Sequence, residues 1–285
     1  MPELPEVETI RRQLSPLLPG RVVVDAWSHP SAKFTPAVGI VGARFDGVAR
    51  RGKFLLLALS DGRELVVHLG MTGSLLLVTD PDAAAALATD PYVRARWALE
   101  GRGEGAGEGP VAAAEAELVF RDIRRFGRLR VVPGGDHRTI PTLAAMGPEP
   151  FDPDLDGDRF AALLARSRRR LKTQLLSQRP IAGVGNIYAD EALWLAGINP
   201  RVTRLGPQRA AALLAALRQV LAQGIDNGGT TLRDYRNAEG GWGSNQATLA
   251  AYGRAGLPCL RCGTPLRSAV IDARSTTWCG ACQRR

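Results

Sequence analysis

Apolar residues between positions 21 and 78 form long continuous runs, with little alternation between apolar and polar side chains. Residues 53–59 and 64–69 are two such runs, and Asp61-Gly62 lies between them. An Asp-Gly pair favours a tight turn between antiparallel strands, so we predict a β-hairpin here. Continuous apolar runs are typical of strands that are covered on both faces. This part of the chain therefore predicts the core of a β-sandwich.

A second hairpin is predicted further along, with residues 92–99 and 117–121 as its strands. Between them, the Gly/Ala/Glu tract at 101–116 has little to bury, so we expect a flexible tip. Residues 131–150 are rich in proline and glycine. We interpret them as a linker into a second domain.

From Asp158 onward the apolar residues recur at helical spacing. The resulting stripe consists of Phe160, Leu163, Leu164, Leu171, Leu175 and Leu176. A following helix is expected from Ile187 to Ala196, with Asn186 as its N-cap and Gly197 and Pro200 at its end. Two helices joined by a glycine-bearing turn predict a helix–turn–helix-like unit whose second helix start can bind phosphate. An ordinary helical hairpin is the alternative.

One more helix is expected at 208–223, and we predict that Gly224 ends it. Residues 226–246 then carry five glycines together with threonine, tyrosine and tryptophan, which is the composition of a mobile loop. Such a loop is often functional, although a disordered segment has the same composition.

Charge is distributed unevenly. The formal net charge is +9, and the whole excess lies in residues 151–285. Basic residues crowd together at Arg166, Arg168, Arg169, Arg170 and Lys172. This asymmetry favours an anionic partner, with a merely solvated basic surface as the alternative. No apolar run is long enough to span a bilayer and no cleavable signal is evident, so we expect a cytoplasmic protein.

The cysteines form two pairs near the end of the chain. They are Cys259, Cys262, Cys279 and Cys282, with 16 residues between the two Cys-x2-Cys pairs. Disulfides are rare in cytosolic proteins. The spacing predicts one structural Zn²⁺ bound by four thiolates in a zinc ribbon, ahead of a redox pair or unligated thiols.

The first residues combine a helix start with reactive groups. Pro5 is expected at the first helical position, with Glu6 and Glu8 near the positive end of the helix dipole. That interpretation leaves Pro2 and Glu3 unexplained. If Met1 is removed, the secondary amine of Pro2 becomes a nucleophile that can form a Schiff base with a carbonyl, and Glu3 is a candidate acid or base.

Seven motifs in this order resemble the formamidopyrimidine-DNA glycosylase branch of a DNA glycosylase family that also contains endonuclease VIII. They are PELPEVET at the start, RRGKFLLL at 50–57, HLGMTGSL at 68–75, RRFG at 124–127, GVGNIYADEAL at 183–193, GGTTL at 228–232 and the closing four-cysteine ribbon. The resemblance covers essentially the whole chain.

The resemblance implies an enzyme of base excision repair that excises oxidised purines, namely formamidopyrimidines and 8-oxoguanine, and then nicks the strand by β,δ-elimination. Pro2 would attack C1′ of the damaged nucleotide, and Glu3 would act as acid and base at the sugar. Lys53 and Arg274 match the other catalytic residues. Arg274 would reach phosphates from the zinc ribbon, and the partner would be double-stranded DNA with oxidised bases or abasic sites, bound by a monomer.

Further residues match those that contact DNA in the family. Met71, Arg124 and Phe126 would fill the gap that the everted base leaves in the stack, since everting a base costs a few kcal/mol. On pattern alone Met71 and Phe126 would be assigned to the core. Lys172 and Asn186 would hold the backbone of the kinked strand, and Arg168 is expected to contact DNA from the arginine cluster.

The implied fold class is α+β. We expect an N-terminal helix with a β-sandwich, a helical helix-two-turn-helix domain and a closing zinc-ribbon hairpin. The expected ranges are 1–132 for the catalytic domain, 133–150 for the linker, 151–240 for the helical domain and 241–285 for the lesion-loop end and zinc finger, the finger itself at about 249–283.

The chain departs from the family pattern in three regions. Ile123 stands where proline is common, and Asp90 and Tyr92 lie where many members have DNA-contacting histidines. Residues 237–246 are an atypical version of the loop that covers the everted base. An endonuclease VIII-like enzyme for oxidised pyrimidines and a non-catalytic binder of damaged DNA are therefore kept as alternatives. Pro2, Glu3 and Lys53 argue against the binder.

Overall fold

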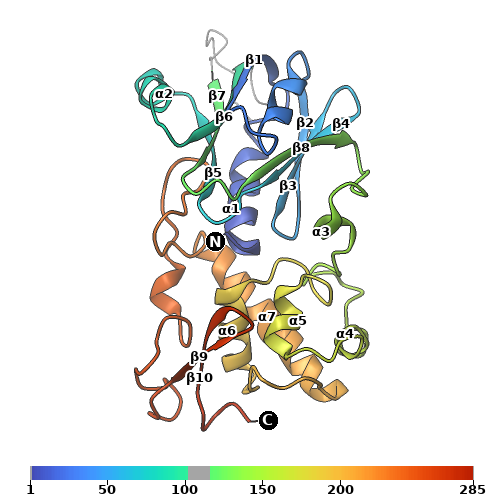
Figure 1. Ribbon diagram of the computed structural model, residues 1–285, viewed down its shortest axis with the longest axis vertical. Helices are drawn as coiled ribbons and strands as arrows, with labels where there is room; N and C mark the ends of the chain where they lie inside the picture. The colour runs from blue at the N-terminus through green and yellow to red at the C-terminus, as the bar shows by residue number, and fades with distance from the viewer. Residues whose placement is uncertain (1, 102–115, 285) are drawn as a thin grey trace. The chain divides into compact units, whose positions relative to one another are not determined.

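The computed structural model describes residues 2–101 and 116–284. The chain forms two compact units. The first contains Met1–Pro141 and Gly228–Ser244, and the second contains Thr142–Asn227 and Asn245–Arg285 (Figure 1). The segment 228–244 therefore belongs to the first unit although helices of the second unit precede it.

The first unit is built on two four-stranded antiparallel sheets, which agrees with the predicted sandwich. One sheet has the order β1-β6-β7-β5, with β1 at Val22–Ser28, β5 at Gly73–Val78, β6 at Val93–Glu100 and β7 at Ala116–Asp122. The other has the order β2-β3-β4-β8, with β2 at Phe45–Arg51, β3 at Phe54–Leu59, β4 at Arg63–His68 and β8 at Arg128–Pro133.

Both predicted hairpins are confirmed. Strands β3 and β4 pair with Leu57 opposite Leu65, and Gly62 in their turn has φ +79°, a backbone conformation that favours glycine. Strands β6 and β7 pair with Trp97 opposite Leu118. Of the tip expected at 101–116, residues 102–115 lie outside the described part of the chain.

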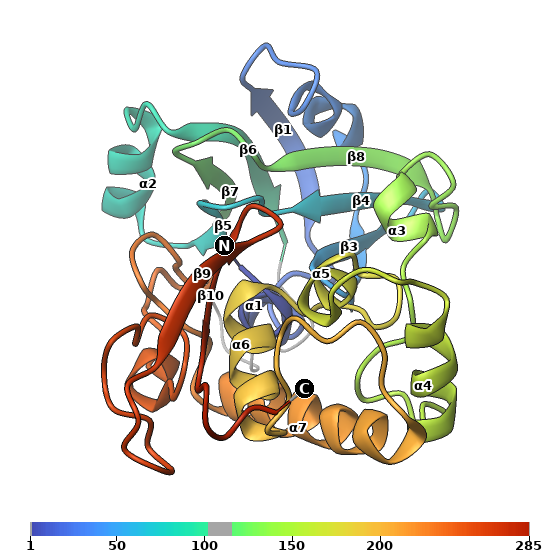
Figure 2. The same ribbon diagram turned by 60° about the horizontal axis from the view of Figure 1, so that its bottom comes forward.

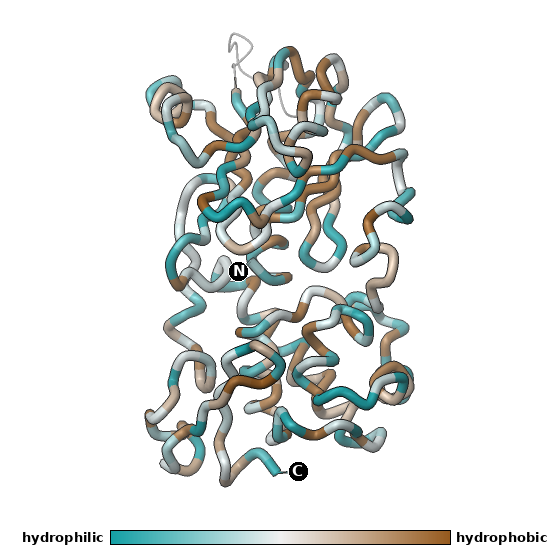
Figure 3. Tube along the Cα trace, in the orientation of Figure 1, coloured by the Kyte–Doolittle hydropathy of each residue, from teal (hydrophilic) through white to brown (hydrophobic). Residues whose placement is uncertain are grey.

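The core of the first unit joins helix α1 to both sheets. Helix α1 (Leu4–Leu14) buries Val7, Ile10 and Leu14 in the same cluster as Leu57 and Trp97. Apolar colouring in Figure 3 is concentrated along the strands of this unit, and the connecting turns are more hydrophilic. Burial of these side chains stabilises the sandwich by about 25 cal/mol per Å² of apolar surface.

One local feature of the first unit differs from the sequence predictions, and another was not predicted. Residues 131–133 are not linker, because they continue strand β8 against β4. The alanine-rich stretch after the sandwich strands forms helix α2 (Pro81–Ala88), and Asp80 caps it by accepting hydrogen bonds from the backbone of Asp82 and Ala83. The short element η1 (Thr35–Ile40) completes this unit, and α3 (Pro141–Ala144) spans the position in the chain where the second unit begins.

The second unit consists of packed helices followed by a small hairpin. Its elements are α4 (Gly157–Ala165), α5 (Leu171–Leu176), α6 (Asn186–Leu195), α7 (Pro207–Asp226), η2 (Asn245–Thr248), β9 (Arg267–Ile271) and β10 (Arg274–Trp278). Helix α7 packs against both α4 and α6, as Figure 2 shows. This agrees with the expected helical domain and closing hairpin.

Three helix boundaries differ from the sequence predictions. The apolar stripe is not one helix, because the arginine-rich residues 166–170 separate α4 from α5. Gly185 is the N-cap of α6, so Asn186 is its first residue. Gly224 does not end α7. It is buried inside that helix, where a Cβ would lie 2.5 Å from the hydroxyl oxygen of Tyr188, so it permits close helix packing.

Candidate active site and DNA-binding surfaces

The N-terminal turn of α1 is held from both sides by Glu6. One carboxylate oxygen of Glu6 accepts a hydrogen bond from the backbone N–H of Glu3 at 2.7 Å. The other accepts from the backbone N–H of Thr230 at 2.7 Å. Glu3 is 1% exposed, and Pro2 is buried. Helix α1 begins at Leu4, so Pro5 is its second residue and not its first as predicted.

The segment 228–244 fits closely over this turn. Gly229 has φ +89°, and a Cβ there would lie 2.9 Å from Cγ of Glu6. Tyr235 donates a hydrogen bond from its hydroxyl to the backbone carbonyl of Glu6 at 3.2 Å. Sequence reasoning treated this segment as a mobile loop. Its contacts instead help to fix the backbone that carries Pro2 and Glu3.

Glu8 is the centre of an ionic network that the sequence did not predict. Its carboxylate binds Arg11 at 2.8 Å, Arg12 at 3.0 Å and Arg50 of strand β2 at 3.0 Å. Burial alone would raise the pKa of Glu8, but the hydrogen bonds from Arg11 and Arg50 outweigh it and lower the pKa to about 2. Glu8 thus anchors α1 to the sheet, beyond the dipole role expected for it.

Lys53 lies in the turn between β2 and β3 and is 7% exposed. Burial, followed by the positive charges of Lys53 and Arg128, lowers the pKa of His68 to about 4. The imidazole of His68 is therefore neutral near pH 7, and its Nδ1 accepts a hydrogen bond from the backbone of Gly70 at 3.2 Å. The candidate lysine thus lies close to His68, in the same unit as Pro2 and Glu3.

Met71 and Phe126 are both exposed, at 39% and 47%, so neither is a core residue. They come from neighbouring loops, since a Cβ on Gly70 would lie 2.4 Å from the backbone nitrogen of Gly127. Arg124 lies over the ring of Phe126 at 5.0 Å from its centroid. The exposure of an apolar chain, a cation and an aromatic ring on adjacent loops suits insertion into a base stack.

A buried carboxylate fixes these two loops. Asp122 accepts hydrogen bonds from the hydroxyl of Thr72 at 2.6 Å and from the backbone of Gly127 at 2.7 Å. Thr72 in turn accepts a hydrogen bond from the backbone of Arg124 at 3.0 Å. Sequence reasoning missed Asp122 and Thr72, because nothing local pairs two residues that lie fifty positions apart.

The two positions that depart from the family's histidines form their own interaction. Asp90 accepts a hydrogen bond from Arg121 at 2.7 Å and another from the backbone of Tyr92 at 2.7 Å. The guanidinium of Arg121 lies 5.1 Å from the centroid of the Tyr92 ring. These side chains hold one another. The atypical loop contains Trp242, which is 72% exposed beneath the guanidinium of Arg236.

In the second unit Lys172 does not lie at the surface. It is 1% exposed, and its ammonium contacts Asp190 at 2.7 Å, the backbone carbonyl of Ser275 at 2.7 Å and the hydroxyl of Thr276 at 3.0 Å. The geometry therefore does not support the direct DNA contact predicted for Lys172. The side chain instead fixes strand β10, which carries Arg274.

Arg274 and Asn186 are placed together by this hairpin. Arg274 is exposed at the first position of β10, directly after the two-residue turn Asp272-Ala273. The side-chain amide of Asn186 donates to the hydroxyl of Ser275 at 3.3 Å. Arg168 is exposed between α4 and α5. The start of α6 and the hairpin tip thus form one polar surface within this unit.

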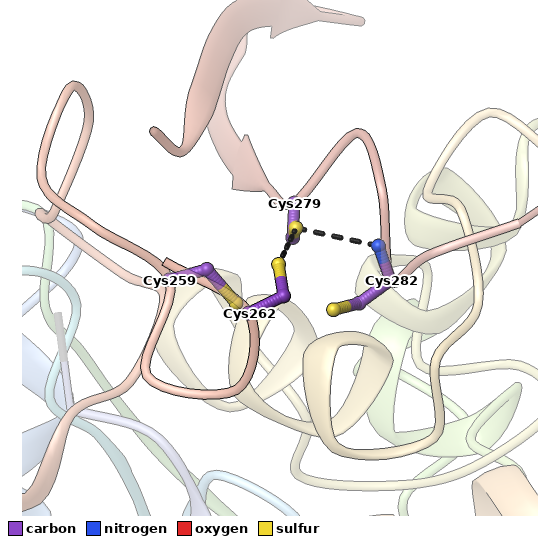
Figure 4. Close-up of side chains that lie close together, drawn as sticks. All are labelled: Cys259, Cys262, Cys279 and Cys282. Carbon is purple, nitrogen blue, oxygen red and sulfur yellow. Dashed lines mark hydrogen bonds between the residues drawn. The ribbon is translucent and has the colours of Figure 1, made fainter. Parts of the chain in front are cut away.

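The cysteine side chains converge, as Figure 4 shows. The sulfur atoms of Cys259, Cys262, Cys279 and Cys282 all lie within 4.8 Å of one another. A tetrahedral Zn²⁺ with Zn–S distances of about 2.3 Å requires sulfurs roughly 3.8 Å apart, so the donor set fits this metal. Because four thiolates complete its coordination, the metal would be structural.

Helix α6 fixes the cysteine cluster through contacts that sequence reasoning missed. The indole of Trp194 donates to the sulfur of Cys259 at 3.4 Å. Arg261 donates to the backbone carbonyls of Trp194 and Leu195 at 3.0 and 2.7 Å, which satisfies the end of the helix. Glu191 accepts hydrogen bonds from three consecutive backbone N–H groups at 250–252.

Family models match three successive parts of the chain. They are described as the formamidopyrimidine-DNA glycosylase N-terminal domain at residues 1–129, the formamidopyrimidine-DNA glycosylase H2TH domain at 146–236, and the zinc finger found in FPG and IleRS at 256–285. Together they span most of the chain. The protein belongs to the formamidopyrimidine-DNA glycosylase family.

Members of this family with high similarity cover almost the full length. The chain is 45% identical to the formamidopyrimidine-DNA glycosylase of Thermus thermophilus, over 99% of this chain and 98% of the relative. It is 41% identical to the formamidopyrimidine-DNA glycosylase of Deinococcus radiodurans, over 99% of this chain and 97% of that relative.

Solved structures of the same family resemble this chain over almost its full length. The crystal structure of the MutM (Fpg) protein from Thermus thermophilus has a TM-score of 0.85 and 44% identity, with 99% of this chain and 98% of that chain covered. Lactococcus lactis Fpg in complex with DNA containing an abasic site has a TM-score of 0.82 and 29% identity, and the match covers 99% of this chain and 100% of that chain.

No helix in the described part of the chain is long and apolar enough to cross a membrane.

Proposed function

We propose that this protein is a monomeric DNA glycosylase and abasic lyase of base excision repair that acts on oxidised purines in double-stranded DNA. The observation that carries the proposal is the fixed N-terminal turn, in which Glu6 holds the backbone of Glu3 and thereby positions Pro2. The relatives named above are formamidopyrimidine-DNA glycosylases, and one is seen with abasic DNA. The proposal includes a bacterial cytoplasmic location, which the bacterial source of these relatives supports.

The reaction begins at the secondary amine of Pro2 once Met1 has been removed. Its lone pair attacks C1′ of the damaged nucleotide, and the bond from C1′ to the base breaks with its electron pair leaving on the base. Glu3 donates a proton to the ring oxygen of the sugar, so that the ring opens and the C1′–nitrogen bond becomes an iminium.

Strand cleavage follows from the acidity that the iminium gives to C2′. Removal of a C2′ proton expels the 3′ phosphate in β-elimination, and a second elimination expels the 5′ phosphate. Lys53 is the proposed proton carrier in the first elimination, and Arg274 is proposed to stabilise the phosphate that leaves in the second. The products are a one-nucleotide gap flanked by phosphates and a released sugar fragment.

Positively charged side chains suit both elimination steps. Lys53 lies near the neutral His68, and Arg274 is exposed on the hairpin that Lys172 fixes. Cationic groups of this kind stabilise the negative charge that develops on the leaving phosphates. The zinc site maintains the hairpin and supplies no step of the chemistry.

Borohydride trapping tests the proposal. The purified protein is incubated with duplexes that carry 8-oxoguanine, an oxidised pyrimidine or an abasic site, and the Schiff base is reduced to a stable adduct. We expect a covalent adduct on 8-oxoguanine and on the abasic site. Absence of any adduct would overturn the enzyme assignment, and trapping on the pyrimidine alone would assign an endonuclease VIII-like activity.

The Pro2→Gly variant supplies the matched control. It keeps an N-terminal amine and removes the secondary amine that the mechanism uses, so we expect a strong loss of trapping. Full lyase activity in this variant would contradict the assignment of the nucleophile. Intact-mass measurement of the wild type must show that Met1 has been removed.

A further inference from the structure

The second unit contains a pocket of about 720 Å³ whose charged lining is basic. Its charged side chains are Arg170, Arg201, Arg204 and Arg209. Arg170 precedes α5, Arg201 and Arg204 belong to the connection between α6 and α7, and Arg209 lies in the first turn of α7. The fold, and not a local run of basic residues, therefore assembles this cluster.

Little of the charge in the pocket is neutralised. Arg170 pairs with Asp272 at 3.4 Å, and both side chains are nearly half exposed. Within residues 2–101 and 116–284, the other three arginines form no ion pair with a carboxylate. Several guanidinium groups around one hollow, of which only Arg170 pairs with a carboxylate in the described part of the chain, create a strongly positive potential.

Two of the arginines are held in place without losing their charge. Arg209 donates a hydrogen bond to the backbone carbonyl of Arg284 at 3.1 Å. The guanidinium of Arg201 lies 5.0 Å from the centroid of the Trp278 ring. A carbonyl and an aromatic face orient a guanidinium and leave it available to an anion. The pocket is therefore organised before any ligand arrives.

The helix dipole and the apolar wall add to this character. Arg209 is the third residue of α7, a helix of 20 residues, so the positive end of that helix lies beside the pocket. Val270, which is 74% exposed, lines the pocket next to these charges. A group that combines an anion with a small apolar part, such as a sugar phosphate, fits this surface.

The pocket is adjacent to the strand that carries Arg274. Ile271 lines the pocket, and it is the direct cross-strand partner of Arg274 in the β9–β10 hairpin. A DNA strand carries one phosphate per nucleotide. A duplex held at Arg274 therefore carries further phosphates along the strand, and these are the candidate ligands for the neighbouring pocket.

We propose that this pocket binds a phosphate group, and that in the DNA complex this group is a backbone phosphodiester outside the reacting nucleotide. The proposal rests on the proposed function for its source of phosphate. Guanidinium groups match phosphate oxygens with paired hydrogen bonds, so the four arginines of the pocket suit this ligand.

Arg204→Gln is the first test. The side chain of Arg204 forms no hydrogen bond or ion pair within the described ranges, so its replacement should leave the fold intact. Binding of a lesion duplex is measured across a series of salt concentrations. We expect an affinity about five- to tenfold lower near 0.1 M salt, and a slope of log K against log salt that is smaller by about 0.9.

Two further variants complete the comparison. Arg138→Gln removes the same charge from an 88% exposed site in the first unit, and we expect little change in the slope. Arg204→Lys keeps the charge and should recover most of the slope. An unchanged slope in Arg204→Gln, or an equal loss in Arg138→Gln, would overturn the proposal.

Duplex length and free anions separate the possible sources of phosphate. If Arg204→Gln binds a long lesion duplex more weakly than the wild type does, but binds a duplex shortened around the lesion equally well, the ligand is a phosphodiester that flanks the lesion. Free anions are tested with pyrophosphate in thermal unfolding. If pyrophosphate stabilises the wild type but not Arg204→Gln, and the substitution does not change DNA binding, the pocket binds free phosphate anions. That outcome would overturn the proposal that its ligand is a DNA phosphodiester.

The two proposals fail in different ways. Absence of trapping by the wild type on every lesion removes the proposed function. If the wild type is trapped normally and Arg204→Gln binds DNA and pyrophosphate as the wild type does, only the proposal about the pocket is rejected.

Discussion

The ammonium of Lys172 lies 2.7 Å from the carboxylate of Asp190, and each side chain is only 1% exposed. Burial raises the pKa of Asp190 to about 6, although the positive charge of Lys172 opposes this shift. The second oxygen of Asp190 accepts a hydrogen bond from the backbone of Thr277 at 3.0 Å. This pair therefore joins helices α5 and α6 to the hairpin that presents Arg274.

Breaking this pair should destabilise the second unit. We expect Lys172→Met to lower the free energy of unfolding by about 3–5 kcal/mol, because the carboxylate of Asp190 is left buried without its counter-ion. Urea denaturation measures this change. The double variant Lys172→Met/Asp190→Leu should recover much of the loss, and a double variant no more stable than the single one would contradict the explanation.

The Glu8 network makes a prediction about pH. The pKa of Glu8 is lowered in the folded protein from 4.5 to about 2, so its contribution to stability is complete above pH 4.5 and is lost as pH falls towards 2. The penalty of Glu8→Gln, measured by urea denaturation, should be smaller at pH 3 than at pH 7 by about 1–2 kcal/mol, after allowance for solvent screening. An equal penalty at both pH values would show that the ionic contacts do not stabilise the fold.

Gly229 should matter for activity because of its contact with Glu6. We expect Gly229→Ala to slow borohydride trapping by at least about tenfold, since the new Cβ displaces Glu6 and with it the backbone of Glu3. Gly240→Ala is the matched control. Gly240 also has a positive φ, +83°, but a Cβ there would meet nothing within 4 Å. A similar loss of trapping in both variants would mean that backbone strain, and not the contact with Glu6, causes the effect.

The hairpin tip offers a stabilising substitution. Ala273 has φ +62°, a conformation that is unfavourable for a residue with a side chain. Ala273→Gly should raise the free energy of unfolding by about 0.5–1 kcal/mol. Asp272→Gly relieves similar strain but removes the contacts of Asp272 with Thr173 and Arg170, so it should not stabilise the protein. Chemical denaturation of both variants tests this contrast.

Removal of zinc should affect DNA binding before it affects the sandwich. Metal analysis should give one zinc per chain, and a strong chelator should change the fluorescence of Trp194, whose indole contacts Cys259. We expect lesion-duplex affinity to fall by at least about tenfold, because the hairpin that carries Arg274 loses its support. Unchanged DNA binding by the metal-free protein would contradict a structural role for the ribbon.

Features that depend only on neighbouring residues could be predicted from the amino-acid sequence. The Asp61-Gly62 turn, the two predicted hairpins and the paired Cys-x2-Cys motifs are specified within a few positions of the chain. The seven motifs also gave the family, since their order is preserved along the chain. Met71 and Phe126 became candidates in this way, and their exposure excludes the alternative that they belong to the core. Pro2 and Glu3 were candidates already, from the reactivity of an N-terminal proline beside a carboxyl group.

The tertiary structure decided which polar groups are paired across long separations in the chain. Lys172 was expected at a phosphate and is buried against Asp190, and Gly224 was expected to end a helix and instead makes room for Tyr188. Neither outcome follows from local composition, because burial and charge pairing depend on elements that only folding brings together. The same reason explains the four-arginine pocket, whose members come from three separate segments.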